Sequence, residues 1–154
     1  MVIIADEKTD LQRGVTHIGA GVCMVVHDGA GNILLMKRGP KARDERGKWD
    51  ICGGAIEFGE TILEAVIREV DEELCTKPLE VEFLLGYDAH RIINNNQTHW
   101  IQLLHYVKVN RDKVQVGEPH KIAEIGWFTA ENLPEPRHSQ FHKTWNELTR
   151  RGLV

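Results

Sequence analysis

A glycine-rich turn that runs directly into an acidic helix constrains this chain more than any other feature. Residues 53–76 read GGAIEFGETILEAVIREVDEELCT. Glycine adopts backbone conformations that a Cβ forbids, so the glycines that open this stretch predict a tight, shaped loop. Thr61 followed three residues later by Glu64 fits a capping box, which predicts that a helix begins at Thr61. Helical spacing then predicts one buried face, formed by Leu63, Ile67, Val70 and Leu74.

Acidic residues crowd the second half of this helix, and three of them share one face. At about 100° per residue, Glu69, Glu72 and Glu73 fall in one patch, whereas Asp71 points away. Like charges at these spacings destabilise a helix by about 0.2–0.5 kcal/mol per pair, so the patch is favourable only when a cation neutralises it. A solvated acidic face is the simple alternative. The glycine loop beside the carboxylates instead favours a site for a metal-bound phosphate, because Mg²⁺ prefers carboxylate oxygens.

The same stretch resembles the Nudix box, whose pattern is Gx5Ex7REUxEExGU, with U an aliphatic residue. The positions that match, with the same spacing, are Gly54, Glu60, Arg68, Glu69, Val70, Glu72 and Glu73. Cys75 and Thr76 depart from the pattern, which has Gly and an aliphatic residue there. Because that Gly would end the helix in a left-handed conformation, the departure costs about 1 kcal/mol at the helix end and leaves the carboxylates untouched. Cys52 stands where many relatives have Pro before the glycine pair.

The resemblance implies a metal-dependent hydrolase. Mg²⁺, or Mn²⁺, would be held by three carboxylates and one backbone carbonyl, from Glu69, Glu72, Glu73 and Gly54. The metal would polarise phosphoryl oxygens and lower the pKa of a bound water. Arg68 would orient the glutamates by charge-assisted hydrogen bonds, and Glu60 would be an auxiliary ligand.

The general base and the substrate contacts are less constrained. Base candidates are Glu72 in the box, and Glu118 and Glu124 around the start of the last predicted strand. Residues 37–48 are rich in Lys and Arg, which suits phosphate oxygens opposite the acidic helix, although a solvated loop is the alternative. The expected substrate contacts are Arg38, Glu57 and Trp49. For Trp49, stacking on a base competes with a place in the core, and the core is favoured.

The rest of the chain predicts a mixed α/β or α+β fold, with a mixed sheet between helices. Apolar, β-rich runs and turn signals predict strands at residues 16–27, 33–38, 79–88, 97–109 and 122–129. The first two strands form a hairpin, and a polar turn at residues 94–96 joins the next two. Ser139 is placed to cap a final helix that runs through Arg151 and is closed by Gly152. The resemblance sharpens this order to a Nudix-like α/β/α sandwich, and the length of 154 residues predicts a single domain over residues 1–154.

Composition and charge exclude several classes of protein. A net charge of −4 argues against general affinity for nucleic acid or for an anionic membrane. Residues 1–14 lack the apolar core of a signal peptide, and no run is long enough to span a membrane. The cysteines Cys23, Cys52 and Cys75 form no CxxC pair, which favours free thiols in a reducing compartment over disulfides or a zinc site. We therefore expect a cytoplasmic protein, and a homodimer is left open.

The histidines predict no metal centre. His99 and His105 share strand parity but lie six residues apart, and His138 and His142 form an HxxxH without the Glu of the zinc-protease pattern. All eight histidines are expected to lie at the surface or half-buried.

The predicted reaction is hydrolysis of a nucleoside diphosphate linked to another group, X, so the expected partner is a small-molecule nucleotide. A small domain resembles the MutT-type enzymes, which convert a nucleoside triphosphate to a monophosphate and pyrophosphate. Nucleotide sugars, ADP-ribose and dinucleoside polyphosphates stay open as substrates. Two further alternatives are a non-catalytic nucleotide sensor and an enzyme like isopentenyl-diphosphate isomerase on the same fold.

Overall fold

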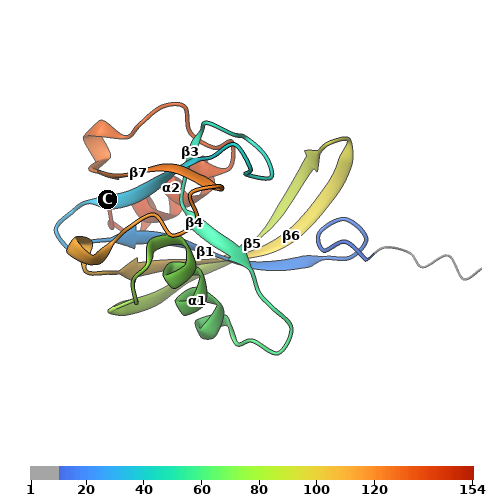
Figure 1. The fold of residues 1–154 in the computed structure, drawn as a ribbon, viewed down its shortest axis with the longest axis horizontal. Coiled ribbons are helices and arrows are strands. Elements are labelled where there is room, and N and C mark those ends of the chain that lie inside the picture. The colour runs from blue at the N-terminus through green and yellow to red at the C-terminus, as the bar shows by residue number, and fades with distance from the viewer. Residues whose placement is uncertain (1–10) are drawn as a thin grey trace, which may run out of the picture.

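The structure, a computed structural model, describes residues 11–154. Residues 1–10 lie outside the described part, and with them most of the segment in which no signal peptide is expected. Seven strands form one sheet in the order β3-β2-β1-β6-β5, with β4 paired to β1 and β7 paired to β2. Figure 1 shows this sheet with helices α1 and α2 on different sides of it. The elements are β1 (Gly19–His27), β2 (Ile33–Arg38), β3 (Trp49–Asp50), β4 (Cys52–Ala55), α1 (Ile62–Leu74), β5 (Glu80–Ile93), β6 (Asn96–Lys108), the 3-10 turn η1 (Arg111–Lys113), β7 (Ile122–Phe128), the 3-10 turn η2 (Ala130–Asn132) and α2 (Phe141–Arg150).

One parallel pairing makes the sheet mixed, as the sequence predicts. β1 runs parallel to β6, whereas the β1–β2, β1–β4, β2–β3, β2–β7 and β5–β6 pairings are antiparallel. Both predicted hairpins are present, and in the second β5 runs five residues further than expected, to Ile93. Its turn residues Asn94 and Asn95 have φ angles of 50° and 65°. Positive φ at both central positions is what a tight two-residue hairpin turn requires.

The two faces of the sheet carry two separate hydrophobic clusters. On one face, Val22, Met24 and Val26 of β1 pack with Val66 and Val70 of α1. Because side chains alternate along a strand, the intervening residues of β1 reach the other face. There they pack against α2, in a cluster that includes Cys23, Val25, Phe141 and Leu148. This arrangement is the predicted α/β/α sandwich.

The prediction of the buried face of α1 is wrong for the first half of the helix and correct for the second half. The helix begins after Thr61 with the expected capping box, and Val70 and Leu74 are fully buried. Leu63, however, is 54% exposed, and Ile67 is only half-buried. Burial begins at Ala65 and Val66, at the end of the first turn, because the residues before them extend past the cluster that the helix covers.

The end of α1 keeps its left-handed residue without glycine. Cys75 is the C-cap, with φ 55° and ψ 31°, and its N–H donates to the carbonyl of Asp71 at 2.9 Å. The departure from the box pattern therefore changes the residue at the helix end and not the backbone conformation there.

The start of the last helix differs from the prediction. α2 begins at Phe141 with Gln140 as its N-cap, and no side chain caps it. Ser139 does not cap the helix, because its hydroxyl donates instead to Glu45 at 2.8 Å. Gly152, with φ 68°, follows the helix as expected. Among residues 11–154, no helix is both long enough and apolar enough to cross a membrane.

Candidate active site

Arg68 of α1 connects three carboxylates of the acidic site. Its guanidinium donates to both oxygens of Glu60, at 2.7 and 3.0 Å. Its Nη1 donates to Glu69 at 2.6 Å and to Glu72 at 3.2 Å. A bond from Nη2 to the carbonyl of Ala55 (2.9 Å) ties the helix to β4. Such charge-assisted bonds are roughly twice as strong as neutral ones, so a single side chain orients all three acids. Its hydrogen bonds to Glu60 also lower the pKa of that carboxyl to about 2.

The glycine pair of β4 lies directly beneath these acids. Pairing with β1 sets Gly53 opposite Cys23 and Gly54 opposite Val22. A Cβ on Gly54 would stand 2.1 Å from Glu69 Oε1, so only glycine leaves room for that carboxylate. The N–H of Gly53 donates to Glu73 Oε2 at 3.1 Å.

Burial and mutual repulsion raise the pKa of two of the carboxyls. Glu73 is 7% exposed, and burial raises its pKa well above the usual value, with further contributions from the charges of Glu69 and Glu118. Burial likewise raises the pKa of Glu69, although the hydrogen bond from Arg68 opposes it. Crowded carboxylates beside a glycine cradle suit a hard divalent cation, which would neutralise them. The donor set present in this chain therefore fits Mg²⁺ or Mn²⁺.

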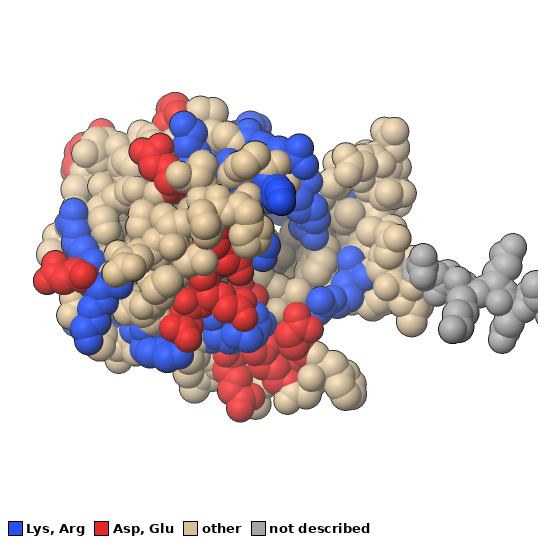
Figure 2. All heavy atoms as spheres, in the orientation of Figure 1, with Lys and Arg blue, Asp and Glu red and all other residues tan. Residues whose placement is uncertain are grey.

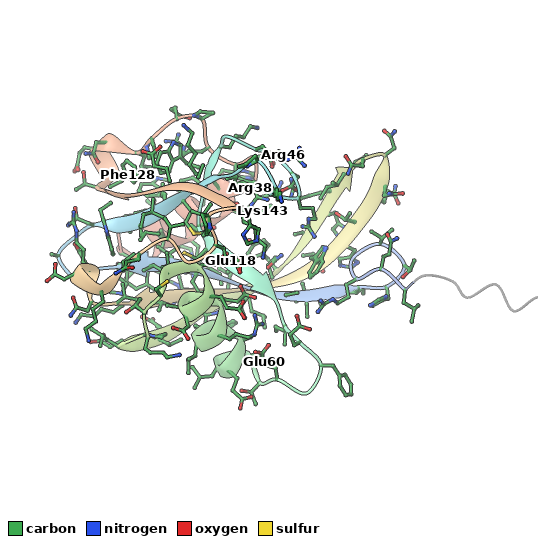
Figure 3. The ribbon with its side chains drawn as sticks, in the orientation of Figure 1. Arg38, Arg46, Glu60, Glu118, Phe128 and Lys143 are labelled. Carbon is green, nitrogen blue, oxygen red and sulfur yellow. The ribbon has the colours of Figure 1, made fainter. Side chains whose placement is uncertain are left out.

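The helix terminus brings Glu118 to the same acids. The N–H groups of Gln115 and Gly117 donate to the last carbonyls of α1, those of Leu74 (3.0 Å) and Glu73 (2.9 Å). This docking places Glu118 close enough for its charge to raise the pKa of Glu69 and Glu73. Figure 3 shows Glu118 near one end of α1 and Glu60 near the other.

The other distant base candidate lies elsewhere. Glu124 is on β7, opposite Lys37 of β2, and its carboxylate is 4.0 Å from the Lys37 ammonium and 59% exposed. Neither Glu124 nor Glu118 is among the residues that line the cavity of this site, but Glu118 lies close enough for its charge to raise the pKa of Glu69 and Glu73.

A cavity of about 680 Å³ joins the acidic site to the basic loop. Its acidic wall contains Glu57, Glu69, Glu72 and Glu73, with Arg68 among them, and its other basic residues include Arg38, Lys41, Arg43, Arg91 and Lys121. Figure 2 shows acidic and basic side chains on the two sides of this hollow. The predicted opposition of a basic loop and an acidic helix is thus present in three dimensions.

Of the three predicted substrate contacts, Arg38 and Glu57 line the cavity and Trp49 does not. Arg38 lines the cavity, but its guanidinium already pairs with Asp44 (2.5 Å) and Asp50 (3.5 Å). Glu57 also lines the cavity and lies 3.5 Å from Arg13. Trp49 is 7% exposed and packs edge-on against Phe128, with ring centroids 5.2 Å apart. Its indole belongs to the hydrophobic core and does not line the cavity, because the strand pairing of β3 turns it inward.

The model of the NUDIX domain family matches residues 17–148. The chain belongs to the Nudix family. Among relatives, an ADP-ribose pyrophosphatase of Methanocaldococcus jannaschii is 35% identical over 103 residues, which cover 67% of this chain and 57% of that protein. A Nudix hydrolase of Yersinia pestis is 44% identical over 73 residues, which cover 47% of this chain and 40% of that protein. The chain thus spans about half the length of these curated relatives.

Solved structures share the Nudix fold. A MutT Nudix hydrolase from Burkholderia pseudomallei superposes with a TM-score of 0.76 at 26% identity, covering 86% of this chain and 98% of that one. The MutT protein from Methanosarcina mazei Go1 gives a TM-score of 0.74 at 22% identity, covering 88% of this chain and 95% of that one. The mixed sheet and the helix that carries the Nudix box therefore have direct counterparts in known structures.

Several residues of this Nudix cavity were not predicted from the sequence. Asp50, Trp100 and Gln140 come from β3, β6 and the segment before α2, and all three line the cavity. Trp100 Nε1 and Gln140 Oε1 are buried without a hydrogen-bond partner in the described part of the chain, so both can meet a ligand. Burial raises the pKa of the Asp50 carboxyl to about 7. No local pattern marks these residues, because only the pairing of β3 and β6 and the path of the chain into α2 bring them to the Nudix box.

Proposed function

We propose that the chain is a divalent-metal-dependent hydrolase that cleaves a nucleoside diphosphate linked to another group, X. The observation that carries this proposal is the Arg68 cluster, in which one guanidinium at the wall of a cavity orients two acids of that wall, Glu69 and Glu72, and bonds also to Glu60. The volume of the cavity, about 680 Å³, falls within the roughly 300–1,000 Å³ typical of small-molecule sites.

Each part of the cavity has a role in this reaction. Glu69, Glu72, Glu73 and the carbonyl of Gly54 would hold Mg²⁺ or Mn²⁺. When bound, the metal supplies charge neutralisation on the phosphates and lowers the pKa of a bound water. Lys41 and Arg43 form no ion pair with a carboxylate of residues 11–154, so their charges remain for phosphate oxygens. Arg68 keeps the carboxylates in place throughout.

Of the three acids predicted as the general base, Glu72 and Glu118 are the two that we favour. Glu72 is 46% exposed at the cavity wall, and Glu118 approaches the acids from the segment before β7. A general base typically contributes a factor of about 10²–10⁴ to the rate. If Glu118 is the base, Glu118→Gln lowers kcat by at least about 100-fold and leaves the Mg²⁺ dependence unchanged. If Glu72 is the base, Glu118→Gln retains most of the activity.

The substrate we favour first is a nucleoside triphosphate, hydrolysed to a monophosphate and pyrophosphate as in MutT-type enzymes. The second candidate is ADP-ribose, which is favoured by the 35% identity to the M. jannaschii protein named for that activity. A nucleotide sensor without catalytic activity would not need the complete set of box acids together with Arg68. The presence of the complete set therefore supports catalysis.

We also propose a cytoplasmic location, which suits the free thiols of Cys23, Cys52 and Cys75.

A substrate panel tests the proposal. The purified chain is incubated with standard and oxidised nucleoside triphosphates, ADP-ribose, nucleotide sugars and a dinucleoside polyphosphate, each with Mg²⁺ and with EDTA. Chromatography of the products should show a nucleoside monophosphate, released from one substrate class and only with the metal. Glu73→Gln is the negative control. If a folded protein that binds Mg²⁺ hydrolyses no substrate of the panel, the result would favour a sensor or the isomerase-like chemistry.

A further inference from the structure

The β5–β6 hairpin carries a cluster of two histidines and an aspartate on the face opposite the cavity. Side chains alternate along a strand, and Ala89 and Arg91 of β5 and Trp100 of β6 line the cavity. The intervening side chains therefore project from the other face. Among them, His90 stands directly opposite His99 in the strand register. Asp88 lies two residues before His90, on the same face.

The three side chains already contact one another. The rings of His90 and His99 lie with their centroids 4.1 Å apart, and His99 Nε2 is 2.8 Å from Asp88 Oδ1. One ligand atom from each of the three residues fits within 4.8 Å of the others. In tetrahedral coordination at about 2.0–2.1 Å, neighbouring ligand atoms are roughly 3.4 Å apart. Small side-chain rotations therefore suffice to bring all three atoms around one ion.

The carboxylate of this cluster is available to a cation. Within residues 11–154, His99 is the only ion-pair partner of Asp88, which is exposed.

A second group of similar composition has carboxylates that are already paired with Lys and Arg side chains. Asp44, Glu45 and His138 also lie within range of one ion. There, however, Arg91 pairs with both carboxylates, at 2.6 and 2.7 Å. Lys48 lies a further 2.8 Å from Glu45. The acids of that group are neutralised by the protein itself, and a cation would have to displace those charges.

We infer that Asp88, His90 and His99 form a binding site for a borderline transition-metal ion of the Zn²⁺ type, separate from the site of the Nudix box. Two imidazoles and one carboxylate are the donor set of Zn²⁺ and its neighbours in the transition series, whereas Mg²⁺ takes oxygen ligands. Three protein ligands leave the fourth position of a tetrahedral ion open. His17 lies near this cluster, because it lines the pocket of about 650 Å³ that His90 and His99 also line. Its Nδ1 lies 3.2 Å from the Thr16 hydroxyl.

The position of the site gives the ion a structural effect. β1 pairs with β6 only from Trp100 onward, so His90 and His99 lie one position beyond that pairing, where β5 and β6 continue as a two-stranded ribbon. Asp88 lies opposite Ile101, still within the three-stranded part. Figure 1 shows this hairpin extending beyond the rest of the sheet. Two-stranded hairpins are only marginally stable by themselves. An ion bound to His90 and His99 would cross-link the ribbon at its base, next to residues that wall the cavity on the other face.

Metal binding to the folded chain tests this inference directly. Zn²⁺ binding is measured by titration calorimetry in saturating Mg²⁺, so that the carboxylates of the Nudix box are already occupied. Co²⁺ serves as a spectroscopic probe, because imidazole ligation changes its visible absorption. We expect one Zn²⁺ per chain that His90→Ala and His99→Ala each weaken by at least about tenfold. The exposed His142 of α2 gives the matched control, and His142→Ala should leave binding unchanged.

Two further measurements separate loss of the site from loss of the fold. Circular dichroism in EDTA checks that each variant folds, and His90→Gln offers a polar replacement of similar size. Zn²⁺ should raise the Tm of the wild type and leave that of His99→Ala unchanged. Equal Zn²⁺ stoichiometry and affinity in wild type, His90→Ala and His99→Ala, all folded, would overturn the inference. None of these readouts depends on turnover of a nucleotide.

Discussion

Gly54 and Glu69 approach so closely that a Cβ on the glycine would stand 2.1 Å from the Glu69 carboxylate oxygen. The obstructed group is the end of a flexible side chain, so the fold can absorb the clash and the carboxylate must move. Gly54→Ala should therefore lower kcat by at least about tenfold and leave the Tm close to that of the wild type. Gly53→Ala is the informative contrast, because its Cβ would meet the backbone carbonyl of Val22 at 2.6 Å and should reduce stability. Full activity in Gly54→Ala would show that the position of Glu69 does not matter.

Charge removal at the box acids tests the metal assignment. Glu72→Gln and Glu73→Gln should each lower kcat by at least about 100-fold, because each removes a negative charge where the metal is proposed to bind. The fold should persist, since an amide oxygen at position 73 can still accept the Gly53 N–H. Asp71→Asn is the matched control, because Asp71 is on the same helix but points away and pairs with Lys77 at 2.7 Å. Near-wild-type turnover in both glutamine variants would contradict the assignment.

Arg68 acts, in this proposal, by positioning the acids. Arg68→Lys keeps the charge but cannot reproduce bonds to Glu60, Glu69 and Glu72 at once. We expect kcat to fall and the Mg²⁺ concentration for half-maximal activity to rise about 10- to 100-fold. Arg150→Lys changes a similar Arg–Glu contact on α2, to Glu147, and should leave the Mg²⁺ titration unchanged. An unaltered Mg²⁺ titration in Arg68→Lys would rule out the positioning role.

The left-handed conformation of Cys75 at the end of α1 allows a test of stability that does not depend on catalysis. A side chain with a Cβ is strained at the φ of 55° that Cys75 adopts, and glycine is not. Cys75→Gly should raise the free energy of unfolding by about 1 kcal/mol, measured by urea denaturation. Cys75→Ala retains the Cβ and removes the thiol, so it should give no comparable gain. A similar gain in both variants would assign the effect to the thiol.

Asp50 predicts a pH dependence of stability. Burial, with the charges of Asp44 and Glu45, raises its pKa from 3.8 to about 7 despite the opposing charge of Arg38. The folded chain therefore keeps a proton that the unfolded chain loses, and the free energy of unfolding falls as the pH rises from about 4 to about 7. Asp50→Asn removes this loss, and at pH 8 it should be more stable than the wild type by roughly 2–4 kcal/mol. The two proteins should converge near pH 4.

For Glu45 we expect the opposite dependence of stability on pH. Burial favours the neutral form of Glu45, but hydrogen bonds from Lys48 and Ser139 hold its pKa at about 2. The ionised group therefore stabilises the fold above the unfolded value of 4.5, and that stability is lost as the pH falls toward 2. Glu45→Gln should be less stable than the wild type at pH 7 and should approach it in acid. Parallel pH profiles for wild type, Asp50→Asn and Glu45→Gln would contradict both pKa shifts.

Local chemistry explains how much of the site was predictable. The capping box at Thr61, the helical spacing of Glu69, Glu72 and Glu73, and the hairpin turns depend on residues a few positions apart, and the structure contains all of them. The errors occur where tertiary contacts decide. Leu63 fits the helical pattern but lies beyond the buried cluster, and Ser139 has a capping side chain that bonds to Glu45 instead.

The sequence by itself determined the Nudix box, its helix and its opposed charges, because fixed spacing along one helix is enough to align carboxylates on one face. Only the tertiary structure decided which distant groups join them. Asp50, Trp100 and Gln140 reach the cavity through the pairing of β3 and β6 and the path into α2. His90 and His99 become neighbours only through the β5–β6 register, since a shift of one residue would send one of them to the other face of the sheet.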